Sequence, residues 1–363
     1  MDLLILDKNF ASLDILDSYE SLIWTDRYRA YGDFEIYASV DNRILDVCQA
    51  GRYLWRDGSE HTMIIEGRTI DTDVENGASL TITGRSLESI LDRRVVWKQT
   101  ILEGNFQDSI EKLLNEAIIA PEDEKRKISN FIFKKSEDAR ITELTLEAQI
   151  SEGENLYEVI VALCEGMDLG FKITLSEQNE FIFELYKGED RSYNQEKNPY
   201  VLFSPEFDNV VNSNYYESVA ELKNFVLVCG TKNDQSKKYV TIGDDIPGLD
   251  RKEIYRDASD VSDTNETGEV IPEETFTEQL KQKGQETLDE NKMKKTFEGE
   301  IDVTQSFVYG RDFSLGDIIQ LTNEYGIEAR SRIDEMVYSE DESGITTVPT
   351  LSAVEDEEKE ETA

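Results

Sequence analysis

Short apolar runs separated by turn residues fill the first hundred positions of the chain. This spacing is typical of β-strands, and the runs cover residues 3–6, 13–16, 22–27, 32–40 and 53–56. Two further runs, 63–72 and 79–84, flank Glu75-Asn76-Gly77, which is a strong hairpin signal. Residues 1–97 are therefore predicted to be rich in β-structure.

Helical spacing replaces this pattern further along. A short helix over 86–92, capped by Ser86, ends the β-rich region. Asn105 caps the next helix, whose apolar face is formed by Phe106, Ile110, Leu113, Leu114 and Ala117. A third helix begins after residue 155 and carries the apolar stripe Leu156, Val159, Ile160 and Leu163, with Gly166 as its stop. Strand-like runs over 170–175 and 180–186 predict a hairpin, so residues 98–200 are expected to form an α+β insertion.

The β pattern returns after residue 200. Strands are predicted over 210–216, 224–231 and 238–242. The acidic segment 257–270 predicts a mobile loop, and a helix is expected over 272–295, where Pro272 fits the first turn and Gly284 weakens the helix. The β pattern then resumes from 297 to 351. A chain that leaves a β-domain and returns to it suggests nested, discontinuous domains.

The segment Tyr309–Leu321, YGRDFSLGDIIQL, is the most informative part of the last β region. Its apolar faces come from Phe313, Leu315, Ile318 and Leu321. Gly316-Asp317 and the later Tyr325-Gly326 are turn signals between strands. The segment carries no reactive apparatus, and its apolar faces and turn signals predict strands of a small β-barrel built for assembly.

The charge balance narrows the choice of partners. Lys and Arg number 38 and Asp and Glu 78 among 363 residues, giving a formal net charge of −40. Phosphate binding needs clustered cations, so no affinity for nucleic acid is expected, and an acidic surface would let DNA slide past. The length allows roughly two to four domains. Neither a signal peptide nor a membrane-spanning stretch is expected.

Candidates for catalysis or metal binding are scarce. Cys48, Cys164 and Cys229 are predicted to be buried, reduced thiols. A Cys–His peptidase would have to combine one of them with His61, the single histidine, and a zinc peptidase motif needs more than one. The acidic pattern from Asp71 to Gly77 departs from a calcium loop by one position, so a hairpin is the simpler interpretation. We predict no catalytic, cofactor-binding or metal site, and solvated loops at Asp244-Asp245 and in the 257–270 segment.

Arginines and tryptophans allow two interpretations each. Five arginines stand out in this acidic chain: Arg27, Arg29, Arg85, Arg93 and Arg94. Local ion pairs with the excess carboxylates are the simpler role, and the alternative places some of them at subunit contacts. The tryptophans are predicted to be core residues rather than contact residues: Trp24, Trp55 and Trp97.

Five segments together resemble one protein family. They are Tyr31–Ile36 (YGDFEI), Gly84–Arg94 (GRSLESILDRR), Gly153–Ile160 (GENLYEVI), Leu280–Leu288 (LKQKGQETL) and Tyr309–Leu321. With these segments in order along about residues 2–352, the chain resembles the tail-tip hub proteins of long-tailed bacteriophages (siphophages). This module is found at the N-terminus of tail-associated lysins and is related in fold to the baseplate hub of contractile-tailed phages.

The resemblance implies a multidomain hub fold that is mainly β with an α+β insertion. Two β-barrel domains plus two smaller domains would be discontinuous in sequence. The first barrel would take residues 1–97 and part of 201–256, and the second 215–255 with 296–352. The remaining parts would be the insertion 98–200, an acidic loop and helix over 257–295, and a disordered acidic tail over 353–363.

The resemblance also implies a structural virion protein and not an enzyme. A ring-shaped homotrimer would cap the tail tube and form an acidic channel for DNA ejection, through which DNA passes without specific binding. Its partners would be the distal tail protein, the tail tube and the tape-measure protein, with a tail fibre, spike or separate lysin as further neighbours. The implied location is the tail tip of the virion, assembled in the host cytoplasm, with no membrane insertion and no C-terminal lysin domain.

Two other functions stay open as alternatives. One is a tail-tip cell-wall hydrolase, since paired carboxylates are abundant, although with 78 acidic residues such pairs carry no signal. The other is a receptor- or carbohydrate-binding tail protein, and its only motivation is a set of aromatic residues expected to be exposed: Tyr193, Tyr200, Tyr215 and Tyr216.

Overall fold

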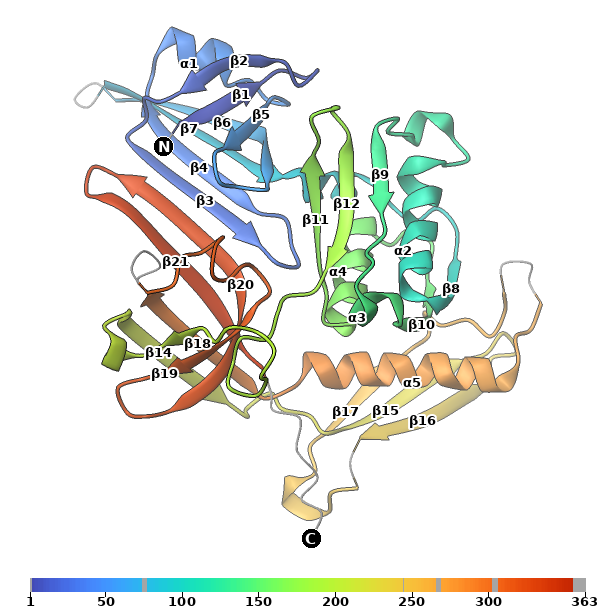
Figure 1. Ribbon diagram of the computed structural model, residues 1–363. Coiled ribbons are helices and arrows are strands. Elements are labelled where there is room, and N and C mark those ends of the chain that lie inside the picture. Colours follow the sequence, from blue (N-terminus) through green and yellow to red (C-terminus); the bar gives the residue numbers. More distant parts are fainter. Residues whose placement is uncertain (1, 74–76, 244, 266–268, 302–305, 355–363) are drawn as a thin grey trace.

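The protein is mainly β and contains several sheets (Figure 1). The computed structural model describes residues 2–73, 77–243, 245–265, 269–301 and 306–354. The mainly β character expected from the sequence is therefore confirmed. The tail over 355–363, for which disorder is predicted, lies outside the described residues.

One sheet of 13 strands joins the two ends of the chain. Its N-terminal strands are β1 (Leu3–Leu6), β2 (Ser12–Leu16), β3 (Ser21–Arg27), β4 (Asp33–Ser39), β5 (Tyr53–Arg56), β6 (Thr62–Asp73) and β7 (Gly77–Ser86). The later strands are β13 (Leu202–Phe203), β14 (Val210–Ser218), β18 (Lys294–Ile301), β19 (Ile318–Thr322), β20 (Glu328–Asp341) and β21 (Gly344–Ala353). The order is β14-β18-β21-β20-β3-β4-β7-β6-β5-β1-β2, with β19 beside β20 and β13 beside β19.

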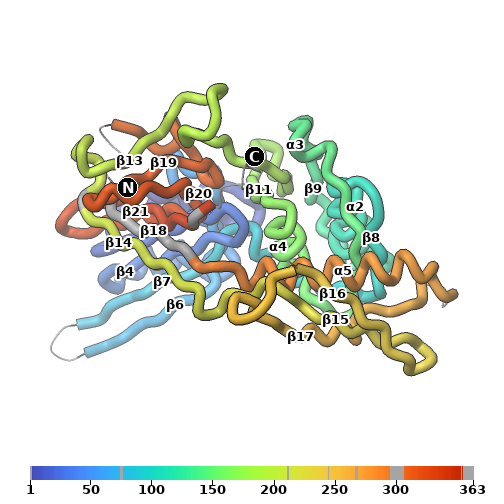
Figure 2. The backbone as a smooth tube through the Cα atoms, turned by 90° about the horizontal axis from the view of Figure 1, so that it is seen from below, coloured from blue at the N-terminus to red at the C-terminus, as the bar shows by residue number. Residues whose placement is uncertain are grey.

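The strands predicted from the first 84 residues are all present. Alternating burial, such as the pattern of β4, shows why: one face packs on the core and the other meets solvent. Strands β6 and β7 form the predicted hairpin, whose far ends extend beyond the neighbouring strands (Figure 2). Its turn residues Glu75 and Asn76 lie outside the described residues. Helix α1 (Asn42–Val47), capped by Asp41, was not expected because six residues give too little periodicity.

Strand β20 connects the two halves of the large sheet. Its first residues, 328–332, pair with β19, and Glu335–Glu340 pair with β3. The register shifts between Ile333 and Glu335, where a bulge bends the strand at the change of partner. The core under this sheet accordingly mixes residues from both ends of the chain, among them Trp24, Phe203, Phe313 and Met336.

A separate α/β region lies beside the large sheet (Figure 1). It contains β8 (Thr100–Asn105), α2 (Phe106–Leu114), β9 (Phe131–Lys134), α3 (Ala139–Thr142), β10 (Thr145–Ile150), α4 (Leu156–Gly166), β11 (Gly170–Leu175) and β12 (Phe181–Tyr186). Strands β11, β12 and β9 form one sheet, and β8 and β10 another. The cap at Asn105 and the hairpin of β11 and β12 are confirmed.

Two details of this region differ from the sequence prediction. Residues Leu87–Arg93 form a 3₁₀ helix, and Ser86 does not cap it. The Ser86 hydroxyl instead donates to Glu88 and accepts a hydrogen bond from the amide of Gly32 at 2.7 Å. Strands β8, β9 and β10 were also missed, because their pairing partners are distant in sequence and local periodicity carries no trace of them.

A third unit packs helix α5 (Glu273–Glu290) on a small sheet, below the α/β region in Figure 1. The sheet consists of β15 (Phe225–Thr231), β16 (Lys237–Gly243) and β17 (Glu253–Asp257) in the order β16-β15-β17. The predicted helix exists but ends at Glu290, because Lys294 already begins β18. Within the expected unit 215–255, β14 pairs with β18, whereas β15–β17 pair with one another among the described residues. The assignment of this sheet to a hub domain stays a prediction.

Gly284 has a packing role that the sequence did not reveal. A Cβ at this position would lie 2.9 Å from Val228 and 3.0 Å from Ile242. On the sheet side, a Cβ at Gly230 would lie 2.8 Å from Leu280. The helix can therefore approach the sheet closely because both positions lack a side chain.

The segment expected to be a mobile acidic loop is partly packed. Ala258 and Val261 are buried in the core under α5. The Asp263 carboxylate accepts a hydrogen bond from the amide of Asn233 at 3.0 Å, and the amide of Ser262 donates to Gln149 on β10 at 2.9 Å. The described residues 258–265 thus tie the third unit to the α/β region rather than forming a solvated loop.

Candidate functional site at the motif junction

Three of the segments that carry the family resemblance meet in space. The Tyr31 and Tyr157 rings lie 4.8 Å apart, and the Arg85 guanidinium lies 4.9 Å from the centre of the Tyr31 ring. Arg85 also pairs with Asp92 at 2.9 Å, and the side-chain amide of Asn155 donates from Nδ2 to the same carboxylate at 2.9 Å. The hydrogen bond from Arg85 lowers the pKa of Asp92. These contacts join β7, the 3₁₀ helix and α4.

Tyr28 lies at the centre of the adjoining contact between the large sheet and the α/β region. Its side chain is fully buried. A Cβ at Gly170 would lie 2.2 Å from the Tyr28 ring, and a Cβ at Gly316 would lie 2.3 Å from it. A Cβ at Gly188 would in turn lie 2.0 Å from the Gly316 backbone. The ring is therefore held between backbone segments that only glycine allows to come this close.

Asp168 collects three cations at the same junction. Its carboxylate lies 2.7 Å from Arg29, 2.8 Å from Arg332 and 3.5 Å from Lys187. These partners come from the segment after β3, from β20 and from the segment after β12. Charge-assisted hydrogen bonds of this kind are the stronger ones. One side chain after α4 thus fixes the α/β region to both halves of the large sheet.

The segment Tyr309–Leu321 forms a loop up to Asp317 and then enters β19. The strand expected after the turn is therefore confirmed over Ile318–Leu321, whereas the expectation of a strand before the turn is wrong. Asp317 is buried and accepts hydrogen bonds from the amide of Glu189 and from Arg191, both at 2.7 Å. The turn at Gly316 is confirmed, with φ of +85°. The buried Asp317 carboxylate satisfies these two donors, and these hydrogen bonds set the conformation of the loop. Strand pairing does not set it.

His61 belongs to a buried ion pair. Its Nδ1 lies 3.2 Å from the Glu88 carboxylate, which also accepts from the amide of Ile173 at 2.8 Å. Burial opposes the charged imidazolium, but Glu88 and Asp26 outweigh it and raise the pKa of His61 to about 9. His61 is 4% exposed and Glu88 is not exposed at all. A substrate cannot reach these groups, so the geometry is that of a structural pair.

The three cysteines have the environment of structural thiols. Cys48, Cys164 and Cys229 are free and buried, as expected. Burial raises the pKa of Cys48 to about 11 and that of Cys164 to about 12. Neither thiol is therefore ionised at neutral pH, which a nucleophilic cysteine requires.

No metal site is formed by the part of the chain that the structure describes. It contains no group of three His, Cys, Asp or Glu residues that could hold an ion. Asp71 lies on β6 with its side chain exposed, whereas Glu75, Asn76 and Asp244 lie outside the described residues. The calcium interpretation therefore finds no support in the described geometry.

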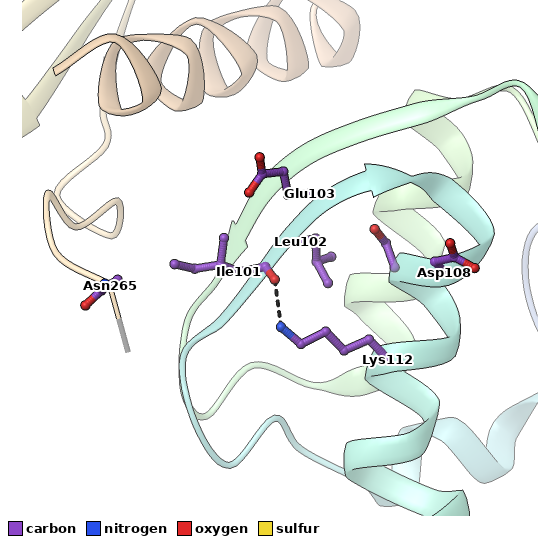
Figure 3. A pocket seen from close by; sticks show the side chains of 7 residues that line it. Ile101, Leu102, Glu103, Asp108, Lys112 and Asn265 are labelled. Carbon is purple, nitrogen blue, oxygen red and sulfur yellow. Dashed lines mark hydrogen bonds between the residues drawn. The ribbon is translucent and has the colours of Figure 1, made fainter. Parts of the chain in front are cut away.

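A surface cavity of about 520 Å³ lies between β8, α2 and the segment around Asn265 (Figure 3). Lys112 points across it and donates from Nζ to the carbonyl of Ile101 at 2.9 Å. Ser109 also lines the cavity, but the single histidine is buried elsewhere. The cavity thus lacks the serine–histidine arrangement of a hydrolase.

Four of the five singled-out arginines form local ion pairs. Arg27 binds Asp33 and Glu335, Arg29 binds Asp168, Arg85 binds Glu66 and Asp92, and Arg93 binds Glu66. Arg94 is different. Its guanidinium donates to the carbonyls of Arg93 and Arg126, both at 3.0 Å, and makes no ion pair with a described carboxylate. The simpler interpretation is therefore confirmed for the other four.

The aromatic residues divide between core and surface. Trp24 is fully buried, as expected, but Trp55 is 36% exposed and Trp97 is 51% exposed, so the core prediction for these two is wrong. Tyr193 and Tyr200 are exposed, with their rings 5.4 Å apart. Their part in a receptor contact stays a prediction. None of the described helices is long and apolar enough to cross a membrane.

The fold is that of phage tail proteins along the whole chain. A tail protein from Neisseria meningitidis MC58 has a TM-score of 0.58 at 13% identity, covering 98% of this chain and 96% of that one. Prophage tail protein gp18 from Listeria monocytogenes EGD-e has a TM-score of 0.57 at 11% identity, covering 98% and 95%. The prophage MuSo2 43 kDa tail protein from Shewanella oneidensis has a TM-score of 0.57 at 12% identity, covering 97% and 98%.

The family follows from the sequence itself. The family model of Siphovirus ReqiPepy6 Gp37-like proteins matches residues 2–351, and the chain belongs to this family. By family and fold it is a phage tail structural protein, similar to baseplate and tail-tip proteins. No curated protein sequence matches the chain. The resemblance drawn from the five segments is thus confirmed.

Proposed function

We propose that the chain forms a homotrimeric hub at the tip of a siphophage tail. The observation that carries the proposal is that nearly the whole chain, and not one domain of it, has the fold of phage tail proteins. Motif residues such as Tyr31, Arg85 and Tyr157 also support it, because they connect the large sheet to the α/β region and do not form an accessible set of reactive groups. Contacts of this kind suit a protein with a structural role.

Three copies would bring six β-barrel units into a ring that matches a sixfold tail tube. In this proposal strands β1–β7 belong to the first barrel, and β18–β21 belong to the second. A closed ring would protect strand edges such as β2 and β14, which end the large sheet. The distal tail protein, tail tube and tape-measure protein would be its neighbours in the virion.

The net charge of −40 supports an acidic channel through the ring. Carboxylates along its wall would repel phosphates and let DNA leave the particle without sticking. The proposal includes no catalytic step. The deep burial of His61 and the cysteines supports this part.

Native mass spectrometry of the purified chain tests the trimer, with a dominant mass of three chains at micromolar concentration as the expected result. A stable monomer under these conditions would contradict it. A cryo-electron microscopy map of the virion tests the position, and a basic channel wall would overturn the DNA-sliding part. Clearing of a cell-wall suspension by the pure protein would overturn the non-enzymatic part.

A further inference from the structure

A basic and aromatic surface lies on the α/β region, which we call the Trp97 patch: Arg94, Trp97 and Arg126, together with the exposed Lys125 and Lys127 on either side of Arg126 in the chain. The Arg126 guanidinium lies 4.1 Å from the centre of the Trp97 ring and donates to the carbonyl of Val95 at 2.7 Å. Arg94 donates in turn to the carbonyl of Arg126. These hydrogen bonds connect the segment around Arg94 to the segment around Arg126. The Trp97 ring is exposed to solvent.

The four cations of the patch form no ion pairs with the described carboxylates, in a chain with a net charge of −40. Of the nearby acids, Glu116 accepts from Thr100 at 2.8 Å and Glu122 pairs with Lys98 at 2.8 Å. Asp123 accepts from the backbone amide of Lys125 at 3.0 Å, and the exposed Glu124 forms no ion pair with the described residues. The four cations outnumber Asp123 and Glu124, so net positive charge is available to a carboxylate from outside.

Neighbouring cations add to the effect of burial in lowering the pKa of both guanidiniums. Burial and then the neighbouring Arg93 lower the pKa of Arg94. Burial and then Arg94 lower the pKa of Arg126, against a smaller opposing effect of Asp123. An incoming carboxylate would relieve this repulsion.

A cavity of about 240 Å³ adjoins the patch and offers room for a partner side chain. Its lining combines Trp97 and the apolar Leu113 and Ala117 with charged side chains, namely Arg126, Lys98, Glu116 and Glu122. Trp and Arg are among the residue types that most often carry the binding energy of protein interfaces. The Trp97 patch therefore combines an aromatic side chain that can anchor a partner with cations that favour an acidic partner.

We propose that the Trp97 patch binds an acidic surface of a second copy of this chain, so that it forms part of the subunit interface. The inference rests on the proposed homotrimer. Three chains of charge −40 repel one another, so association needs places where opposite charges meet. In a cyclic trimer each interface joins two different surfaces, and a basic patch can face an acidic surface on the next subunit around the ring.

The exposed lysines give the cleanest test. Lys125→Glu with Lys127→Glu reverses two charges whose side chains make no ion pair with the described residues, so folding should be unaffected. Lys197→Glu with Lys237→Glu is the matched control, because these lysines are likewise exposed, without described ion pairs, and outside the patch. Trp97→Ala removes the anchor without a change of charge. Sedimentation equilibrium and native mass spectrometry at two salt concentrations give the trimer dissociation constant.

We expect Lys125→Glu/Lys127→Glu and Trp97→Ala each to weaken the trimer by at least tenfold relative to the control pair. The wild-type trimer should also weaken as salt rises, and the charge-reversed variant should lose that dependence. A trimer that resists both variants as well as the control overturns the patch assignment and leaves the trimer intact. A tail that fails to assemble from intact variant trimers also overturns it, because the patch would then bind another tail protein. A monomeric wild type overturns the proposed trimer and this interface together.

Discussion

Gly316 lies directly against the ring of Tyr28, and a Cβ at Gly316 would come within 2.3 Å of that ring. Its φ of +85° is also one that side chains other than glycine rarely adopt. This contact joins the segment before β19 to the segment after β3. Two independent requirements therefore make position 316 intolerant of any side chain.

Gly316→Ala should destabilise the protein by about 2–4 kcal/mol, the sum of backbone strain and overpacking. Gly310→Ala is the control, because Gly310 has a φ of +79° but open space around its Cβ position. Strain alone should cost that variant about 1 kcal/mol. Urea denaturation followed by tryptophan fluorescence measures both. Equal shifts of the two midpoints would show that the Tyr28 contact contributes nothing.

Asp168→Asn should loosen the attachment of the α/β region to the large sheet. Arg332, whose side chain is 4% exposed, would lose its carboxylate along with Arg29. Because the carboxylate itself is 45% exposed, we expect a loss of about 1–3 kcal/mol rather than the larger cost of a fully buried pair. Hydrogen exchange should show faster exchange in β20 and around Tyr28.

Glu122→Gln provides the comparison for Asp168→Asn. It breaks the exposed pair with Lys98 and should change stability by less than about 1 kcal/mol. If both variants lose the same amount of stability, the ion pairs of Asp168 do not hold the α/β region to the large sheet.

The His61–Glu88 pair predicts a fall in stability at alkaline pH. The folded pKa of His61, about 9, lies above the value of about 6.5 in an unfolded chain. Its contribution is therefore fully present below pH 6.5 and is lost as the pH rises through about 9. The pKa of Glu88 is lowered, since His61 outweighs the opposing burial, so its contribution is lost when the pH falls below the usual range for Glu.

Urea midpoints at pH 6, 7.5 and 9 measure this effect, which should be of the order of 2–3 kcal/mol between the extremes. His61→Gln cannot take up the proton and should remove most of that slope. A variant that keeps the wild-type slope would assign the pH dependence to other groups.

Gly284→Ala should destabilise the protein although alanine is the better helix former. The added Cβ would press on Val228 and Ile242, so α5 would have to move off its sheet at a cost of about 1–3 kcal/mol. Gly166→Ala at the end of α4 is the matched control, because no atom lies near its Cβ position. That variant should gain up to about 1 kcal/mol. The midpoint of thermal unfolding should therefore fall for Gly284→Ala and rise for Gly166→Ala.

Local patterns were sufficient for elements whose stability is decided by their own residues. Strand β5 lies at Tyr53–Arg56 as predicted, and Asn105 caps α2 as predicted, because alternation and capping act over a few residues. The family, too, could be recognised from five short segments. Elements that depend on distant partners were missed, such as β8 and β10, which pair with each other across some forty residues.

The sequence shows some residues of the candidate site but not how they are arranged. Tyr31, Arg85 and Tyr157 lie in three of the segments that resemble the family, but nothing in their spacing shows that the three side chains meet. The apolar ring of Trp97 predicts a core position, yet the fold leaves it beside Arg126 at the surface. Exposure depends on which other segments arrive, and a single sequence does not record that.

The sequence by itself determined the β-rich character, the main helices, the acidic charge and the family, because each follows from residue type and short-range periodicity. Only the tertiary structure decided that β20 serves both halves of one sheet, that Gly316 and Gly170 enclose Tyr28, and that Arg94 keeps its charge unpaired. The physical reason is common to all three. Close packing and charge neutralisation depend on contacts between residues far apart in the chain, and these exist only once the chain has folded.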